Sequence, residues 1–151
     1  MAEAKSEDFY TLTGYQHREQ GLTPALEDYL EMICRLESQG SQVIRLGELS
    51  QRLHVAPSSA SRMIRQLEGA GFICAPRYGY ITVTPKGRKA GEYLLWRHEV
   101  VQRFLCALNG SSSELEQAEK LEHFLNQETL RNLARLTERL EREAEANNAE
   151  K

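Results

Sequence analysis

The stretch that decides the fold is Leu46-Gly47-Glu48-Leu49-Ser50-Gln51-Arg52-Leu53-His54-Val55-Ala56-Pro57-Ser58-Ser59-Ala60-Ser61-Arg62-Met63-Ile64-Arg65-Gln66-Leu67. Its first half carries apolar side chains on one helical face, and these are Leu46, Leu49 and Leu53. After a short turn, Pro57 suits the first position of a second helix. The buried side of that second helix is formed by Ala60, Met63, Ile64 and Leu67. Two helices joined by so short a turn predict a helix-turn-helix.

The flanking sequence extends this unit on both sides. A helix is predicted from Leu22-Thr23-Pro24 to Ser38, with Thr23 as its cap. Two short strands around a turn near Gly79 form a wing. A long helix from about Lys86 to Leu108 follows, then a helix capped by Ser112 or Ser113, then a last helix from about Asn126. The predicted fold class is therefore mainly α with a small β wing, a winged helix-turn-helix followed by a helical domain.

Charge is unevenly distributed over the 151 residues. Residues 1–41 hold three Lys or Arg and eight Asp or Glu, a net charge of −5. Residues 42–90 hold eight and two, a net of +6, and residues 91–151 hold eight and twelve, a net of −4. The helix-turn-helix thus lies in the one basic segment, which favours contact with a polyanion there.

Composition also indicates in which cellular compartment we expect the protein. No apolar run approaches the ~20 residues that cross a membrane, and the first twenty residues lack the apolar core of a signal peptide. We therefore expect a cytoplasmic protein with no membrane partner. The three cysteines, Cys34, Cys74 and Cys106, form no C-x-x-C pair, which argues against a disulfide framework or a zinc ribbon.

The second helix of the pair is predicted to enter the DNA major groove. Small hydroxyl residues at its start allow close approach to the duplex, and its long polar side chains can reach base edges or phosphates. The expected DNA-binding residues are Pro57, Ser58, Ser59, Ser61, Arg62, Arg65 and Gln66, with Arg77 and Tyr78 on the wing. The alternative is a winged helix used for protein contacts, with solvated arginines.

Acid and imidazole side chains recur at helical spacing in three separate stretches. These are Asp28 with Glu31, then His98 beside Glu99, then Glu119 with Glu122 and His123. Each stretch alone has an ordinary explanation: acids that complement a helix dipole, a packed histidine, and a solvated helix face. If the three converge, four carboxylates and two imidazoles without a thiolate would suit Mn²⁺ or Fe²⁺. Up to four negative charges also suggest two ions with bridging carboxylates.

Several blocks resemble the DtxR/MntR family of metal-dependent repressors. They are Leu22-Thr23-Pro24 with Glu27-Asp28-Tyr29-Leu30-Glu31, Val55-Ala56-Pro57-Ser58-Ser59-Ala60-Ser61, Val83-Thr84-Pro85-Lys86-Gly87, Trp96-Arg97-His98-Glu99 and Glu119-Lys120-Leu121-Glu122-His123. They occur in the family's order over residues 22–140. The resemblance implies a homodimer that binds a palindromic DNA operator when loaded with divalent metal.

The resemblance also implies a metal and its ligands. In the manganese branch of the family the ligands fall at positions that match Asp28, Glu31, His98, Glu119, Glu122 and His123. The iron-responsive branch usually has sulfur-bearing residues at the positions of Asp28 and Glu119, and many of its members carry a C-terminal SH3-like domain that this chain is expected to lack. Both features favour a manganese-responsive repressor with Mn²⁺ as its cofactor, at one or two ions per subunit. An iron-responsive repressor using Fe²⁺ is the alternative.

These inferences divide the chain into four parts. They are a flexible N-terminal arm at 1–21, the winged helix-turn-helix DNA-binding domain at 22–87, a helical dimerisation and metal-binding domain at 88–143, and a frayed tail at 144–151. Leu121, Leu125, Leu130, Leu133 and Leu136 are expected at the dimer interface. Two other classes remain open: a MarR-like winged-helix regulator that senses a small organic ligand, and a di-metal hydrolase. The second lacks any separate general acid, nucleophile or cleft signal, so we expect no enzymatic activity.

Overall fold

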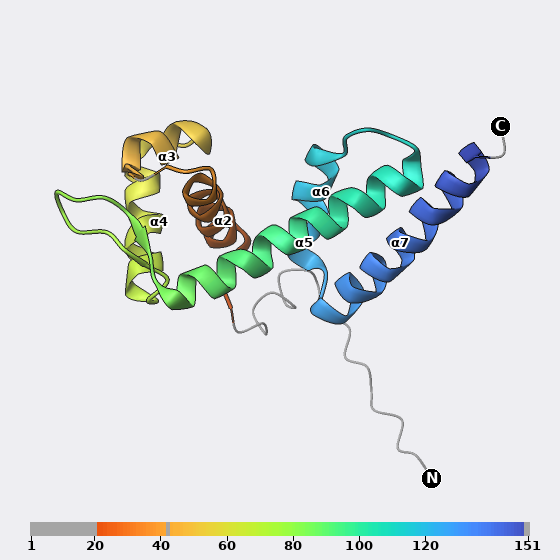
Figure 1. Cartoon of the computed structure of the whole chain (residues 1–151). Coiled ribbons are helices and arrows are strands. Elements are labelled where there is room, and N and C mark those ends of the chain that lie inside the picture. The colour runs from red at the N-terminus through yellow and green to blue at the C-terminus, as the bar shows by residue number, and fades with distance from the viewer. Residues whose placement is uncertain (1–20, 42, 150–151) are drawn as a thin grey trace, which may run out of the picture.

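The computed structural model describes residues 21–41 and 43–149, so nearly all of the predicted N-terminal arm lies outside the described residues. The fold class is confirmed: helices dominate, and two short strands form the wing (Figure 1). The elements in chain order are α2 (Pro24–Ser38), α3 (Leu46–Arg52), α4 (Pro57–Gly69), β1 (Ile73–Cys74), β2 (Thr82–Val83), α5 (Pro85–Asn109), α6 (Leu115–Leu121), the 3-10 helix η1 (Glu122–Phe124) and α7 (Gln127–Ala149).

Local sequence signals set the helix ends. Thr23 caps α2, because its hydroxyl accepts a hydrogen bond from the Leu26 N–H at 3.3 Å. Thr84 caps α5 in the same way, accepting from the Gly87 N–H at 3.1 Å. Both helices, and α4, have proline in the first turn, where no N–H is required. At the other end of α5, Gly110 adopts a left-handed conformation with φ of 64° that ends the helix.

The wing is held against the start of α5. Its strands pair antiparallel, with Ile73 opposite Val83 and Cys74 opposite Thr82. A Cβ on Gly87 would lie 1.8 Å from the Phe72 carbonyl oxygen, so only glycine permits this approach. The wing is thereby fixed relative to the long helix that leads to the rest of the molecule.

Helix α5 runs from α2 and α4 to α6 and α7 (Figure 1), and it joins two apolar clusters. The first cluster lies between α2, α3, α4 and the wing, and it reaches α5 at Leu94. The second begins on α5 at Val100 and is completed by α6 and α7; its buried members are Val100, Val101, Leu105, Ala118 and Leu130. The interval of α5 between the clusters holds Arg97 and His98, both buried.

Two local expectations differ from the structure. Helix α6 has no side-chain cap from Ser112 or Ser113; its N-cap is Glu114, whose carboxylate instead accepts from Ser111 and Asn109. Helix α7 continues to Ala149, past the point near Glu143 where fraying was expected, because its polar sequence still has strong helix formers such as Ala and Glu.

The leucines predicted at the dimer interface differ in their burial. Leu130 is fully buried inside the protomer, so it belongs to the second apolar cluster and not to a contact surface. Leu121 and Leu136 remain exposed, at 37% and 40%. The prediction grouped the five leucines because they lie in the helices that follow α5, and the sequence does not reveal which of them pack inside the protomer.

Candidate metal centre

Four charged side chains are buried among the residues that the structure describes: Glu31, Arg97, His98 and Glu122. We call this set the seam, because it lies between the two apolar clusters and draws on α2, α5 and η1. Burying charge is costly unless the charges are paired or hold an ion. A buried cluster of this kind therefore indicates a functional site.

One group of potential metal ligands is mostly buried: three of its four members are buried, and only the Glu119 side chain is exposed, at 50%. Glu31, His98, Glu119 and Glu122 each offer a ligand atom, and these atoms all lie within 4.8 Å of one another. His98 Nδ1 lies 2.8 Å from Glu122 Oε2, 3.4 Å from Glu119 Oε1 and 4.0 Å from Glu31 Oε1. The hydrogen bond with Glu122 is the main cause that raises the pKa of His98 above its usual range. We call these four residues the enclosed group.

A second group is more open. Asp28, Glu119 and His123 have ligand atoms that also lie within 4.8 Å of one another. His123 Nε2 lies 3.0 Å from Asp28 Oδ1, and the Asp28 side chain is 42% exposed. Because Glu119 belongs to both groups, its carboxylate is placed to bridge two positions. All six predicted ligands are therefore brought together, in two groups that share one member.

The donor set fits a divalent cation. Glu31 Oε2 and Glu122 Oε1 are buried side-chain oxygens without a hydrogen-bond partner in the described structure, and such atoms are rare unless something else satisfies them. Burial is the largest cause that raises the pKa of Glu31 to about 7, and the nearby Glu122 carboxylate adds to it, while a hydrogen bond from Arg35 lowers it. Burial and Glu122 likewise raise the pKa of Glu119. A cation would relieve both the repulsion and the missing hydrogen bonds.

Two supporting residues were not predicted. Arg97 Nη2 forms an ion pair with Glu27 Oε2, and His123 Nδ1 lies 3.2 Å from the same oxygen. Hydrogen bonds to Asp28 and Glu27 raise the pKa of His123 to about 10. The protonated Nδ1 therefore donates to Glu27, which leaves Nε2 directed at the open group.

A sequence signal for this pair existed. Glu27 immediately precedes Asp28, and Arg97 immediately precedes His98. The sequence suggested only a role for Glu27 at the helix N-terminus, because nothing in its spacing reveals a partner 70 residues away. Arg97, at 3% exposure, is the kind of buried charge that only the packing of α5 discloses.

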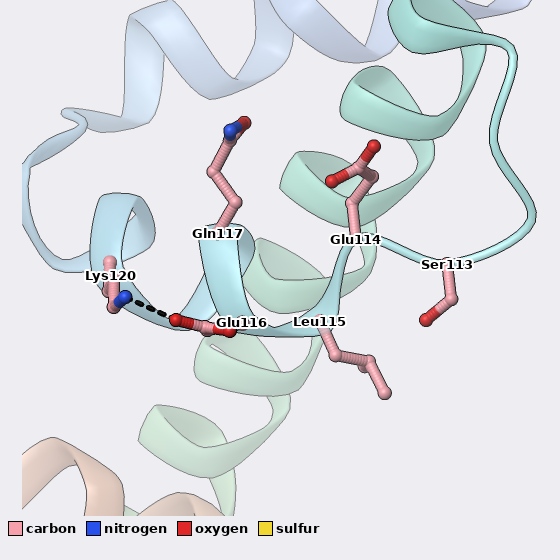
Figure 2. A pocket seen from close by; sticks show the side chains of 6 residues that line it. All are labelled: Ser113, Glu114, Leu115, Glu116, Gln117 and Lys120. Atoms are coloured by element: carbon pink, nitrogen blue, oxygen red, sulfur yellow. Dashed lines mark hydrogen bonds and ion pairs between the residues drawn. The ribbon is translucent and has the colours of Figure 1, made fainter.

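The enclosed group opens into a cavity of about 280 Å³. Its wall comes from α2, α5, α6 and the end of α3, and is lined by Asp28, Glu31, Met32, Arg35, Arg52, Leu53, His98, Leu115 and Glu119. A larger hollow of about 660 Å³ lies along the outer side of α6 (Figure 2). None of its lining side chains belongs to either ligand group, and its Lys120 is paired with Glu116. The chemistry therefore favours the smaller cavity.

The predicted DNA-binding residues lie on one side of α4 and on the wing. Five of those on α4 are exposed, and we call these the α4 face: Pro57, Ser58, Arg62, Arg65 and Gln66. Ser59 and Ser61 are only partly exposed, and the Ser61 hydroxyl accepts a hydrogen bond from Arg65 at 3.3 Å. Four residues of the α4 face, Ser58, Arg62, Arg65 and Gln66, line a shallow hollow.

The wing also carries exposed arginine and tyrosine side chains. Arg77 and Tyr78 are exposed, Tyr78 at 94%, and the Arg77 guanidinium lies 5.7 Å from the Tyr78 ring centre. Arg45 and Tyr80, which were not predicted, form a second such pair at 5.3 Å. They were missed because Arg45 precedes α3 and reaches the wing only through the bridge between Ile44 and Ile81.

Comparison with known proteins decides the family. Residues 21–81 match the model for "Iron dependent repressor, N-terminal DNA binding domain", and residues 84–149 match "Iron dependent repressor, metal binding and dimerisation domain". The chain belongs to the iron-dependent repressor family. Members of this family are metal-dependent, DNA-binding transcriptional repressors, and the predicted resemblance and class of function are confirmed.

Individual members of the iron-dependent repressor family agree. The chain is 35% identical over 106 residues to the HTH-type transcriptional regulator MntR of Geobacillus kaustophilus, which covers 69% of this chain and 74% of that protein. It is 31% identical over 120 residues to the MntR of Lysinibacillus sphaericus, which covers 79% and 86%.

A solved structure described as a manganese-dependent transcriptional repressor complex with manganese matches with 25% identity and a TM-score of 0.69. It covers 74% of this chain and 52% of that one, so the chain spans about half the length of the solved structure. Within the part that the structure describes, no helix is long and apolar enough to cross a membrane.

Proposed function

We propose that this protein is a manganese-responsive repressor: a homodimer that binds a palindromic DNA operator when its subunits are loaded with Mn²⁺. The observation that carries the proposal is the enclosed group, in which Glu31 from the DNA-reading side meets His98 and Glu122 from the helical side within 4.8 Å. The presence of oxygen at both Asp28 and Glu119, where a sulfur donor would favour softer metals, supports manganese. The two MntR relatives support the same metal.

We assign the six ligands to two ions per subunit. Glu31, His98, Glu119 and Glu122 would hold one ion, and Asp28, Glu119 and His123 a second, with Glu119 bridging. The bound cations supply positive charge that offsets the four carboxylates. His123 holds Nε2 toward the second position, since Glu27 accepts a hydrogen bond from its Nδ1. His98 directs Nδ1 toward the first position, where this atom lies 2.8 Å from Glu122 Oε2.

The coupling to DNA follows from where the ligands lie. Asp28 and Glu31 are on α2, which packs with α3 and α4 in the first apolar cluster, while the other ligands follow the wing. A filled site fixes the α4 face relative to α5 and the helical part. In a dimer this sets the separation of the two α4 helices, which must be about one helical turn of DNA or a multiple of it. Without that restraint the DNA-competent arrangement is a minority of the ensemble.

The subunit contact belongs to residues 88–143, and the DNA contact to residues 22–87. The helical part has exposed apolar side chains, which include Leu121, Phe124 and Leu136. They support a contact between this part and a second copy of the chain. The α4 face, Ser59, Ser61, Arg77 and Tyr78 are proposed to contact DNA. We further propose that the protein acts in the cytoplasm and catalyses no reaction.

An operator-binding curve measured across several divalent metals tests this function. The full chain is titrated with Mn²⁺, Fe²⁺, Zn²⁺ and Mg²⁺ against its operator by fluorescence anisotropy, with a chelator control. The proposal predicts tight binding with Mn²⁺ and its loss on chelation. Stronger activation by Fe²⁺ would favour the iron-responsive alternative, and binding that ignores chelation would favour a regulator of the MarR-like class. A hydrolysis assay with Mn²⁺ checks the absence of enzymatic activity.

A further inference from the structure

Arg35 contacts one of the proposed ligands directly. It lies one helical turn after Glu31 on α2, and its Nη2 donates to Glu31 Oε1 at 2.6 Å. The Glu31 side chain is only 6% exposed, and its other oxygen, Oε2, is buried without a hydrogen-bond partner. The Arg35 guanidinium is therefore hydrogen-bonded to Glu31, whereas His98 Nδ1 lies farther from the same oxygen, at 4.0 Å. The spacing of four residues makes this contact possible whenever α2 is folded.

The contact uses a Glu31 oxygen that lies near another proposed ligand. Glu31 Oε1 is the atom 4.0 Å from His98 Nδ1, and Oε2 of the same carboxylate is buried without a partner, so Arg35 and an ion in the enclosed group would draw on the same carboxylate. A guanidinium at hydrogen-bond distance from Oε1 would lie only a few ångströms from a doubly charged ion. Repulsion at such a distance inside a partly enclosed cavity is large. The two cations are thus poor neighbours on one carboxylate.

The Arg35 side chain also has space into which it can rotate. Its side chain is 37% exposed, whereas Glu31 is enclosed. Arg35 lines both the cavity of the enclosed group and a neighbouring hollow that includes Glu99, Gln102 and Arg103. Release of the guanidinium toward that hollow requires rotation of one flexible side chain and no movement of the backbone.

We propose that Arg35 is an internal competitor for the metal: it pairs with Glu31 in the metal-free protein and must leave when the ion binds, so it raises the metal concentration at which the protein responds. This rests on the proposed function and deepens it, because it assigns the set point of the sensor to a residue that is not a ligand. The ion pair between Arg35 and Glu31 stabilises the metal-free form, and the metal ion must displace Arg35 to bind.

The chain offers a matched control for this idea. Arg52 lines the same cavity but touches none of the six ligands; its nearest acid is Glu48, at 4.0 Å. Arg52→Gln removes the same charge from the same cavity without freeing a ligand. A general electrostatic effect would act on both variants, whereas competition acts on Arg35→Gln alone.

The experiment measures Mn²⁺ affinity of the full-length wild type, Arg35→Gln and Arg52→Gln by calorimetry and by the loss of the free Mn²⁺ signal in electron paramagnetic resonance. We expect Arg35→Gln to bind Mn²⁺ about 3- to 10-fold more tightly, and Arg52→Gln to change by less than about twofold. Arg35→Lys, which keeps the charge but not the forked donor, should fall between wild type and Arg35→Gln. Circular dichroism confirms that each variant is folded.

Each outcome separates the proposal from the function on which it rests. An unchanged or weaker affinity in Arg35→Gln overturns the competitor, as does equal tightening in both glutamine variants. A Mn²⁺-loaded structure in which Arg35 still donates to Glu31 Oε1 overturns it independently. Absence of Mn²⁺ binding in every variant, wild type included, rejects the proposed function and the competitor together.

Discussion

The seam and the α4 face use charge in opposite ways. In the seam, Glu31, Arg97, His98 and Glu122 are at most 7% exposed and lie between two apolar clusters. On the α4 face, Arg62 and Arg65 stand in solvent with few partners. Charge that is buried must be compensated from within, either by an opposite charge or by a bound cation. Charge that is exposed remains available for a polyanion. The comparison therefore predicts that mutations in the two regions will separate metal binding from DNA binding.

The largest effect is expected in the seam. Glu122→Gln removes a ligand that is fully buried and bonded to His98, so Mn²⁺ affinity of the enclosed group should fall by more than about 100-fold. Operator binding should then no longer respond to added Mn²⁺. Glu116→Gln, on the exposed side of α6, is the matched control and should behave like wild type. Full metal dependence in Glu122→Gln would remove that residue from the site.

The α4 face should give the converse result. Arg62→Ala or Arg65→Ala should weaken operator binding roughly 5- to 150-fold and lower the slope of affinity against salt by about 1 for a lost phosphate contact. Mn²⁺ affinity without DNA should not change, because neither residue contacts the seam. Arg103→Ala, in an exposed pair with Glu141 far from α4, serves as the control. If neither affinity nor salt slope moves, the assignment of α4 as the DNA-reading helix is wrong.

Next to the seam, removing the support of His123 should have a smaller effect than removing a ligand. Glu27→Gln removes the carboxylate that accepts from His123 Nδ1 and pairs with Arg97. We expect Mn²⁺ affinity of the open group to fall about tenfold, while the enclosed group changes less. Calorimetry that resolves two binding steps would measure this difference. An equal loss in both steps would indicate that Glu27 acts on the fold and not on His123.

The smallest effect is expected in the number of protons released when Mn²⁺ binds. The pKa of His123 is raised to about 10, so its ring is protonated at pH 7, and the pKa of Glu31 is raised to about 7. Metal needs both groups deprotonated, so loading at pH 7 should release about one proton or more per subunit, and Mn²⁺ affinity should increase as pH rises from about 6 to 8. Calorimetry in buffers of different ionisation enthalpy measures the release. Identical heats in all buffers would contradict these protonation states.

Much of the fold was predictable because its signals are local. Thr23-Pro24, Pro57 and Thr84-Pro85 mark helix starts by their own chemistry, and the apolar spacing of Leu46, Leu49 and Leu53 needs no tertiary information. The cap of α6 and the end of α7 were mispredicted, because several polar residues in a row offer alternatives that only packing decides. The burial of Leu130 was hidden for the same reason.

The candidate site likewise has features that the sequence indicates locally and features that depend on tertiary packing. The six candidate ligands could be identified from their residue types and spacing, together with the resemblance that joined the three stretches. Their distribution into two groups sharing Glu119 could not, because η1 replaces the continuous helix on which Glu119, Glu122 and His123 were expected to share a face. The roles of Glu27, Arg97 and Arg35 depend on contacts between side chains, and sequence spacing alone does not reveal such contacts.

The most direct measurement is anomalous diffraction at the manganese edge from crystals of the Mn²⁺-loaded protein. The account predicts a peak within coordination distance of both Glu31 on α2 and His98 on α5, which links the DNA-reading side to the helical side. A fully loaded structure whose manganese contacts residues of only one side, with Glu31 and His98 too far apart to share an ion, would contradict it.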